Sequence, residues 1–265
     1  MTAAVERTAP PIIDMQGVFV ALGDERAPTQ VLNGLDLQVE EGSFTAIVGP
    51  SGCGKTTILN LLADVVAPTA GTVLVQGETP AKTSARAGYM LARDALLPWR
   101  SVRRNVELPL DIRGGVSAER KHEVATELLA RVGLAGSEDR AVKQLSHGMR
   151  QRVSLARILA FDPDMLLMDE PFSALDAQTR MRAQEFFLEV WQRDRKTVLL
   201  VTHDISEAIF MADHILVFSS RPATLLETFT VDFPRPRVLE DVRRTTEFTE
   251  LYEAVWGLLK SDVTY

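Results

Sequence analysis

The chain has 265 residues, of which 46% are apolar and 25% charged, and its formal net charge is −7. This length fits one large or two small globular domains, and the acidic balance argues against a protein that coats nucleic acid. A single cysteine excludes an internal disulfide framework. No apolar run approaches the roughly 18 residues needed to span a bilayer, so any membrane role must come through a partner.

The N-terminal part has the pattern of antiparallel strands. Residues 1–11 lack the apolar core of a signal peptide and are expected to form a flexible lead-in. A strand-like pattern covers residues 12–39 and is broken by a polar loop at 23–28. Over residues 35–40, leucine and valine alternate with polar residues, as in a strand with one face in water. Together with a short strand at 72–75, this predicts an antiparallel β portion.

The most specific pattern of the chain lies between these strands. Residues 44–48 predict a buried strand, residues 58–63 favour a helix, and the loop between them fits G-x-x-x-x-G-K-[ST]. The loop consists of Gly49, Pro50, Ser51, Gly52, Cys53, Gly54, Lys55, Thr56 and Thr57. Unpaired N–H groups at the helix start predict an anion site, in which Lys55 would reach the β- and γ-phosphates and Thr56 would ligate Mg²⁺. The alternative is a glycine-rich turn that only closes a strand–helix unit.

Residues 80–160 lack strand-like runs and have helical patterns instead. A helix is expected around residues 102–108, and residues 119–132 bury an apolar side chain at every fourth position. The section therefore predicts an inserted helical lobe, at about residues 93–160.

A second helix N-terminus follows at Ser146. This serine is a natural N-cap for a helix over residues 149–160, which leaves free N–H groups at His147 and Gly148. Such an end can bind an anion, as the phosphate loop does. Taken alone, it favours a capped surface helix that binds nothing, because serines are common at N-caps.

Two apolar strands end in groups that can do chemistry. Residues 165–168 lead into Asp169 and Glu170, and residues 198–201 are followed closely by His203. Ligands of parallel sheets bind at the carboxyl ends of the strands. Asp169 is therefore expected to hold Mg²⁺ through water, and Glu170 to orient or deprotonate an attacking water. His203 could contact the γ-phosphate or be structural, and the carboxylates could be surface groups after a core strand.

The C-terminal part predicts one more strand and one more helix. Residues 215–218 are expected to be the final strand, residues 219–243 a loop, and residues 246–260 a helix whose apolar face docks on the domain. The histidines and the cysteine show no metal-ligand spacing, and no hydrolase nucleophile motif is present.

These motifs together resemble the ATP-binding cassette (ABC) family over about residues 12–236. Beside the phosphate loop, residues 145–152 are similar to the family's signature helix, residues 165–170 to its Walker B strand and residues 173–176 to its D-loop, and His203 matches the switch histidine. The resemblance implies an α/β fold with a P-loop NTPase (RecA-like) core, an antiparallel β subdomain and an inserted helical subdomain. This ABC ATPase domain would span residues 12–240, with a C-terminal helix within 241–265 packed on it.

The resemblance also implies a mechanism. Two copies would enclose each ATP with Mg²⁺ between one copy's phosphate loop and the other's Ser146, His147 and Gly148. Lys55, Glu170 and His203 would be catalytic, with Thr56 and Asp169 at the metal. The ATPase would bind a membrane permease through residues around 92–99, at the cytoplasmic face of the membrane. A periplasmic or lipid-anchored solute-binding protein would deliver the solute, and nucleic acid would not be a partner.

Within the family, the chain is similar to ATPases of nitrate, sulfonate and taurine importers. The similarity rests on residues 96–100, on the Gly-Met-Arg-Gln-Arg form of the signature, and on the prolines and arginines of 220–222 and 234–237. The long regulatory extension of sugar-importer ATPases is not expected. An exporter ATPase and a soluble cassette ATPase acting on DNA or ribosomes are the alternatives, and the solute stays open.

Four residues depart from the family pattern. Ala92 stands where the Q-loop glutamine would touch Mg²⁺, so hydrolysis is expected to be slower or its coupling looser. Leu22 stands where an aromatic ring would stack on adenine, a contact worth about 1–3 kcal/mol, so modest preference for ATP over GTP is expected. His147 replaces the first signature glycine and would either donate to the γ-phosphate or only be tolerated. Cys53 lies at a helix N-terminus, where a lowered thiol pKa is expected, and its alkylation should block nucleotide binding.

Overall fold

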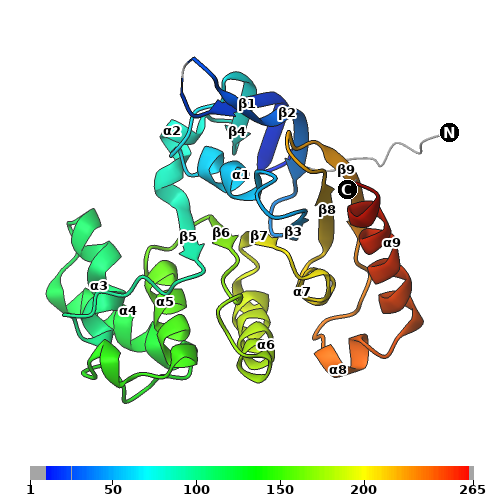
Figure 1. Ribbon diagram of the computed structural model, residues 1–265. Helices are drawn as coiled ribbons and strands as arrows, with labels where there is room; N and C mark the ends of the chain where they lie inside the picture. The colour runs from blue at the N-terminus through cyan, green and yellow to red at the C-terminus, as the bar shows by residue number, and fades with distance from the viewer. Residues whose placement is uncertain (1–9, 25, 263–265) are drawn as a thin grey trace.

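The computed structural model describes residues 10–24 and 26–262, which form two sheets with helices around them (Figure 1). The expected flexible lead-in at residues 1–11 lies outside the described residues except for Pro10 and Pro11. The strands are β1 (Ile13–Leu22), β2 (Thr29–Val39), β3 (Phe44–Val48), β4 (Ala70–Val75), β5 (Ala87–Leu91), β6 (Met165–Asp169), β7 (Thr197–Thr202), β8 (His214–Phe218) and β9 (Leu225–Thr230). The helices are α1 (Lys55–Leu62), α2 (Pro80–Thr83), α3 (Val102–Arg113), α4 (Ala118–Arg131), α5 (His147–Ala160), α6 (Ala177–Asp194), α7 (Ile205–Met211), α8 (Leu239–Val242) and α9 (Thr246–Asp262).

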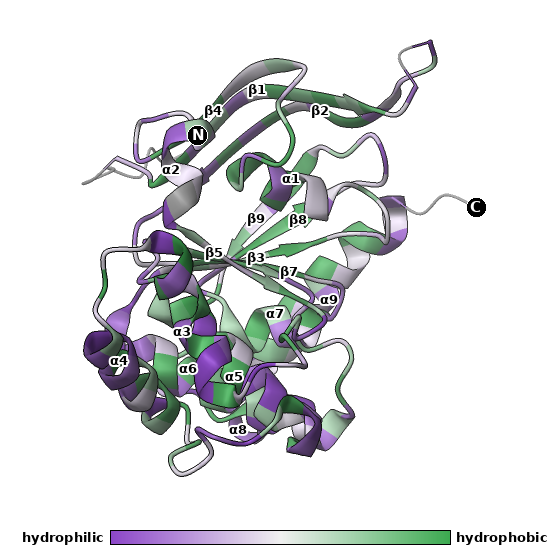
Figure 2. Ribbon diagram, turned by 90° about the vertical axis from the view of Figure 1, so that its left-hand side faces the viewer, coloured by the Kyte–Doolittle hydropathy of each residue, from purple (hydrophilic) through white to green (hydrophobic). Residues whose placement is uncertain are grey.

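The smaller sheet has the order β2-β1-β4 and is antiparallel throughout, which confirms the β portion predicted from sequence. Leu35, Leu37 and Val39 are buried, and the polar residues between them face solvent. Helix α1 lies between this sheet and the larger one (Figure 2). Its Ile58 and Leu59 share one buried cluster with residues of both sheets.

The larger sheet has the order β5-β6-β7-β3-β8-β9, in which only β9 runs antiparallel to its neighbour. Strand β3 is buried at all of its positions and lies between β7 and β8. Val48 pairs with Thr202, and Asp169 pairs with Val201, so β3, β6 and β7 end at the same edge. The phosphate loop and the segments that follow β6 and β7 therefore meet there.

The helical lobe is built from α3, α4 and α5, which pack against one another (Figure 1). Helix α3 is longer than the expected 102–108 and continues through Pro109 to Arg113. The helix continues because Val102, Val106 and Leu110 lie on one buried face. The packing of this face outweighs the loss of the one helical hydrogen bond that Pro109, which has no N–H, cannot donate.

Two regions that were expected to contain no strand each contain one, so these predictions were wrong. Strand β5 lies within the section expected to lack strands and pairs with β6. A Cβ on its Gly88 would lie 2.4 Å from a methyl group of Ile158, so this position requires glycine. Glycine is uncommon inside strands, and its presence makes the segment look less like a strand in the sequence. Strand β9 and helix α8 lie within the expected loop 219–243, and β9 rather than β8 is the last strand. Strand β9 is mostly exposed and is defined by its backbone pairing with β8, so no alternation marked it.

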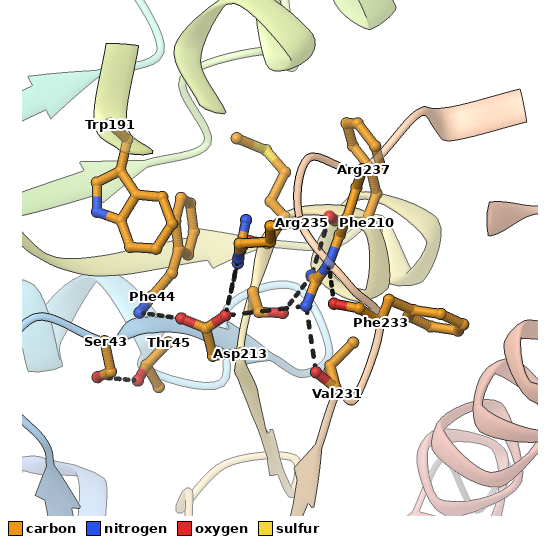
Figure 3. A network of polar contacts seen from close by, with 12 residues as sticks. Ser43, Phe44, Thr45, Trp191, Phe210, Asp213, Val231, Phe233, Arg235 and Arg237 are labelled. Carbon is orange, nitrogen blue, oxygen red and sulfur yellow. Dashed lines mark hydrogen bonds and ion pairs between the residues drawn. The ribbon is translucent and has the colours of Figure 1, made fainter. Parts of the chain in front are cut away.

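A pair of arginines holds the segment after β9 to the sheet and to α7 (Figure 3). Arg237 donates to the carbonyls of Ala212 at 2.6 Å, Phe210 at 3.1 Å and Val231 at 3.1 Å. Arg235 pairs with Asp213 at 2.6 Å. Burial, with a smaller effect of Arg235, lowers the pKa of Arg237 to about 10. The Arg237 guanidinium thus donates hydrogen bonds to carbonyls at the C-terminal end of α7, which a helix end otherwise leaves without a partner.

Helix α9 then docks on the domain, as predicted from its apolar face. Phe248 and Val255 are buried, and Leu251 and Leu259 pack against the same core. Tyr252 stays more than one-third exposed and stacks on Phe248. Within residues 10–24 and 26–262, no helix combines the length and hydrophobicity required to cross a bilayer.

Candidate active site

The phosphate loop joins β3 to α1 and leaves the start of α1 without a side-chain cap. The N–H groups of the first helical turn therefore stay available to an anion. Gly54, at the N-cap, has a φ of 127°, and a Cβ there would lie 2.8 Å from Val31. Lys55 is buried, and its Nζ donates to the carbonyls of Gly49 at 2.7 Å and Pro50 at 2.9 Å. The ammonium thus lies inside the loop and can exchange these carbonyls for other oxygen acceptors.

Thr56 and Asp169 lie side by side at the edge of the sheet. The Thr56 hydroxyl donates to Asp169 Oδ1 at 3.1 Å. Burial raises the pKa of Asp169, and the hydrogen bond from Thr56 opposes this effect. A hydroxyl and a carboxylate are oxygen ligands of the kind that Mg²⁺ accepts when substrate and water complete its shell. In the part of the chain that the structure describes, no three His, Cys, Asp or Glu side chains gather as a metal cage.

Glu170 and His203 also lie together, although 33 positions separate them in the sequence. His203 Nδ1 is 3.2 Å from Glu170 Oε1. Glu170 has a φ of 48°, its N–H donates to Val201 at 2.9 Å, and its carbonyl accepts from the Ser173 hydroxyl at 2.9 Å. A left-handed conformation at a non-glycine residue costs about 1–3 kcal/mol and persists only where neighbours enforce it. These contacts fix the backbone from which the Glu170 side chain extends toward His203.

The three residues at the start of α5 are placed away from the phosphate loop. Ser146 is the N-cap, as predicted, and its hydroxyl accepts from Met149 N at 3.3 Å. The Nδ1 of His147 is buried and has no hydrogen-bond partner among the residues that the structure describes. Among the described residues, no hydrogen bond or ion pair joins Ser146, His147 or Gly148 to residues 49–57, and α5 belongs to the helical lobe (Figure 1). One copy of the chain does not bring its two helix ends together.

Two of the residues that depart from the family pattern, Leu22 and Ala92, lie at the ends of strands. Leu22 is the last residue of β1 and is 39% exposed. Phe19, three residues earlier in β1, is similarly accessible, but its ring packs over Gly34. Ala92 directly follows β5 and supplies no polar side chain.

The sequence did not reveal how α5 is connected to the loop after β5. Arg150 Nε donates to the Asp94 carboxylate at 2.8 Å, and Arg157 donates to the carbonyls of Ala95 at 2.8 Å and Asp94 at 3.1 Å. Burial lowers the pKa of Arg157. The two arginines are seven positions apart, so they lie on one face of α5, and this spacing was the only available signal.

A second missed contact starts from the neighbouring residue of α5. The Gln151 amide donates to the carbonyl of Pro171 at 2.6 Å, directly after Glu170. Helix α5 is therefore attached both to the segment after β5 and to the segment that carries Glu170.

The expected low pKa of Cys53 is wrong. Its side chain is buried, and burial raises the pKa of the thiol, an effect that nearby Lys55 reduces without reversing it. The Sγ packs against Gly49, 3.1 Å from where a Cβ would stand. The helix N-terminus is outweighed by desolvation, which favours the neutral thiol.

Comparisons with known proteins identify the family of the chain. Residues 32–173 match the family described as ABC transporter. The chain is 46% identical over 202 residues, 76% of its length and 79% of the relative's, to the taurine import ATP-binding protein TauB of Yersinia pestis. It is 41% identical over 234 residues, 88% of its length and 86% of the relative's, to an uncharacterised ABC transporter ATP-binding protein of Methanocaldococcus jannaschii.

Two solved structures have the same fold. A dimeric ATP-binding cassette in a post-hydrolysis state with ADP and Pi superposes with a TM-score of 0.72 at 29% identity, covering 84% of this chain and 100% of that one. For cbiO1 of Clostridium perfringens, part of the ABC transporter complex cbiONQ, the TM-score is 0.76 at 20% identity, covering 93% and 96%. The chain therefore belongs to the ABC transporter family and is an ATPase of that family with a P-loop NTPase fold.

Proposed function

We propose that the chain is the ATP-hydrolysing subunit of an importer for small solutes of the nitrate, sulfonate and taurine kind. The observation that carries the proposal is the convergence of Thr56 with Asp169 and of Glu170 with His203 at one sheet edge, beside the phosphate loop. The import direction and the solute class are supported by the similarity to a taurine import ATP-binding protein.

In this proposal the phosphate loop holds the triphosphate. Backbone N–H groups of residues 49–57 donate to its oxygens, and Lys55 Nζ moves from the carbonyls of Gly49 and Pro50 to the β- and γ-phosphates. Leu22, at the end of β1, lies against the adenine without aromatic stacking.

Thr56 and Asp169 are the residues that would hold Mg²⁺. When bound, the metal neutralises charge on the β- and γ-phosphate oxygens. The Asp169 carboxylate must be ionised for this role, and Thr56 favours that form through its hydrogen bond.

Glu170 is the proposed general base. It takes a proton from the water that attacks the γ-phosphorus, while the bond from phosphorus to the β–γ bridging oxygen breaks. His203, 3.2 Å from Glu170 Oε1, orients that carboxylate and would contact the γ-phosphate. The fixed backbone of Glu170 keeps the base in place before the substrate arrives.

The separation of the two helix ends in one copy supports a dimer. Ser146, His147 and Gly148 would complete the nucleotide site of a second copy, since the start of α5 has free N–H groups and does not contact its own phosphate loop. A similar cassette forms a dimer with ADP and Pi.

The proposed permease contact lies at the loop after β5. Leu91 is 49% exposed and Trp99 is 77% exposed, on a loop that Arg150 and Arg157 attach to α5. Large apolar side chains that are left exposed mark candidate interaction sites. The subunit would then act at the cytoplasmic face of the membrane, and a periplasmic or lipid-anchored solute-binding protein would reach it only through the permease.

Phosphate release by the Glu170→Gln variant tests the enzymatic part. We expect turnover about 10²–10⁴ times lower than wild type with ATP binding intact, because a general base is worth that much. The exposed Glu253→Gln on α9 is the matched control and should hydrolyse ATP as wild type does. Wild-type turnover in Glu170→Gln would refute the role of Glu170.

Purification from detergent-solubilised membranes tests the transport part. An integral-membrane permease, identified by mass spectrometry, should co-purify with the wild type and be lost with Trp99→Glu. Trp256→Glu changes an exposed tryptophan on α9 and should retain the permease. Recovery with nucleic acid instead of a membrane protein would contradict the proposal.

A further inference from the structure

Arg221 contacts the phosphate loop from a distant part of the chain. Its Nη2 donates to the carbonyl of Gly52 at 2.6 Å, across 169 positions of sequence. Apart from the loop's own Lys55, no other described side chain donates to the backbone carbonyls of residues 49–57. The contact therefore brings an additional positive charge to the loop.

The turn that carries Arg221 is itself fixed. Ser219 N–H donates to the carbonyl of Thr224 at 3.0 Å, which closes the turn between β8 and β9. Ala223 N–H donates to Val31 at 2.8 Å and its carbonyl accepts from Asn33 at 3.1 Å, so the turn is bonded to β2. The guanidinium is thus presented by backbone that both sheets hold in place.

The end of α9 reaches the same turn. The N–H of Ser220 donates to the carboxylate of Asp262, and its hydroxyl donates to the Asp262 carbonyl at 3.5 Å. Ser220 is the residue immediately before Arg221. The turn is therefore held from β2 on one side and from the last residue of α9 on the other.

The contact of Arg221 with the Gly52 carbonyl restrains the peptide that joins Gly52 to Cys53. In a trans peptide the carbonyl and the following N–H point in opposite directions, so a donor fixed on the Gly52 carbonyl also fixes the direction of the Cys53 N–H. Among the described residues, the Gly49 carbonyl accepts a hydrogen bond from Lys55 alone, and the Pro50 carbonyl accepts from Lys55 and from the Cys53 N–H at 3.3 Å, which belongs to the same Gly52–Cys53 peptide. When Lys55 binds phosphate instead, the bond from Arg221 still restrains the loop.

We propose that Arg221 is a positioning residue of the nucleotide site, which holds the Gly52–Cys53 peptide in the conformation that binds the phosphates. The proposal rests on the proposed role of the phosphate loop in binding ATP. Arg221 acts through the loop, so it contributes to nucleotide affinity and leaves the chemical step to Glu170.

Nucleotide titration of the full chain tests the proposal. For Arg221→Ala we expect the Kd for both MgATP and MgADP, and the KM for ATP, to rise about 3- to 10-fold, the range for one ordinary hydrogen bond, because water screens the charge of this exposed arginine. The kcat at saturating ATP should stay within about twofold of wild type, since no transition-state contact is lost. Arg221→Lys keeps a cationic donor and should recover part of the affinity. Arg244→Ala, which removes an exposed arginine before α9, should bind as wild type does.

An unchanged Kd for both nucleotides in Arg221→Ala would overturn the proposal. If kcat and Tm fall at that unchanged Kd, Arg221 is a merely structural residue. The test is separable from the proposed function: if the wild type itself binds no MgATP, the phosphate-loop assignment fails, whereas equal binding by wild type and Arg221→Ala removes only the role of Arg221.

Discussion

His203 Nδ1 lies 3.2 Å from Glu170 Oε1, although the two residues come from different strand ends. Strands β6 and β7 are neighbours, and Asp169 pairs with Val201, so the residues that follow the two strands are brought together by the sheet register. The pair joins the proposed general base to a second group that can orient it.

Replacing His203 with alanine tests this pair. Without the imidazole, the Glu170 carboxylate can rotate away from the attacking water, and a misplaced catalytic group costs about 10²-fold in rate. We expect kcat to fall by about that factor while the Kd for MgATP is unchanged. Equal turnover of His203→Ala and wild type in a phosphate-release assay would show that Glu170 needs no orienting partner.

Glu207 predicts a pH dependence of stability. It is buried on α7, accepts from the Gln184 amide at 2.7 Å, and burial raises its pKa above the ordinary 4.5. The folded state therefore holds a proton that the unfolded state has lost, so the free energy of unfolding falls as pH rises from the ordinary value to the raised one. Glu207→Gln keeps an acceptor for Gln184 and should lose this decline. If the free energy of unfolding falls equally in wild type and Glu207→Gln as pH rises from the ordinary to the raised pKa, the prediction is wrong.

The ion pair between Asp94 and Arg150 predicts a measurable coupling between the loop after β5 and α5. Both side chains are partly buried, with exposures of 20% and 29%, and the contact is 2.8 Å. We expect a double-mutant cycle with Asp94→Asn and Arg150→Gln to give a coupling energy of about 0.5–1.5 kcal/mol in denaturant unfolding. The exposed pair Arg193–Glu189 is the control and should give about 0.3–0.5 kcal/mol. Additive effects at Asp94 and Arg150 would mean that the loop is not held by this pair.

Leu22→Tyr tests the proposed adenine contact. A tyrosine ring stacked on the base should tighten MgATP binding, since stacking is worth about 1–3 kcal/mol per base, and should increase the preference for ATP over GTP. The corresponding Phe19→Leu change removes a ring that packs over Gly34 and should affect nucleotide preference less. An ATP-to-GTP ratio of Kd values that is the same in Leu22→Tyr and wild type would remove Leu22 from the base site.

Local sequence patterns predicted the helices, strands and loops that carry the candidate site. They did not predict contacts between residues that are far apart in the sequence. The phosphate loop, Asp169, Glu170 and Ser146 belong to motifs whose spacing has a direct physical reason, such as a strand that ends at a helix N-terminus. The contact of Arg221 with Gly52 joins residues with no periodic relation, so no pattern could indicate it. Cys53 was assigned a low pKa from its helix position, because the sequence does not show the burial that raises it.

Strands could be predicted from the sequence only where their side chains have an apolar or alternating pattern. Strand β3 is apolar throughout and was recognised, whereas β9 pairs through its backbone and exposes most of its side chains. The same limit applies to β5, where Gly88 is required by the close approach of Ile158.

Sedimentation of Glu170→Gln with and without MgATP is the most direct test of the account, because the two anion-binding helix ends of one copy do not meet. We expect a monomer without nucleotide, a dimer with MgATP, and loss of that dimer when Ser146→Arg blocks the start of α5. A variant that binds MgATP and stays monomeric, beside a wild type that hydrolyses ATP at full rate as a single copy, would contradict this expectation.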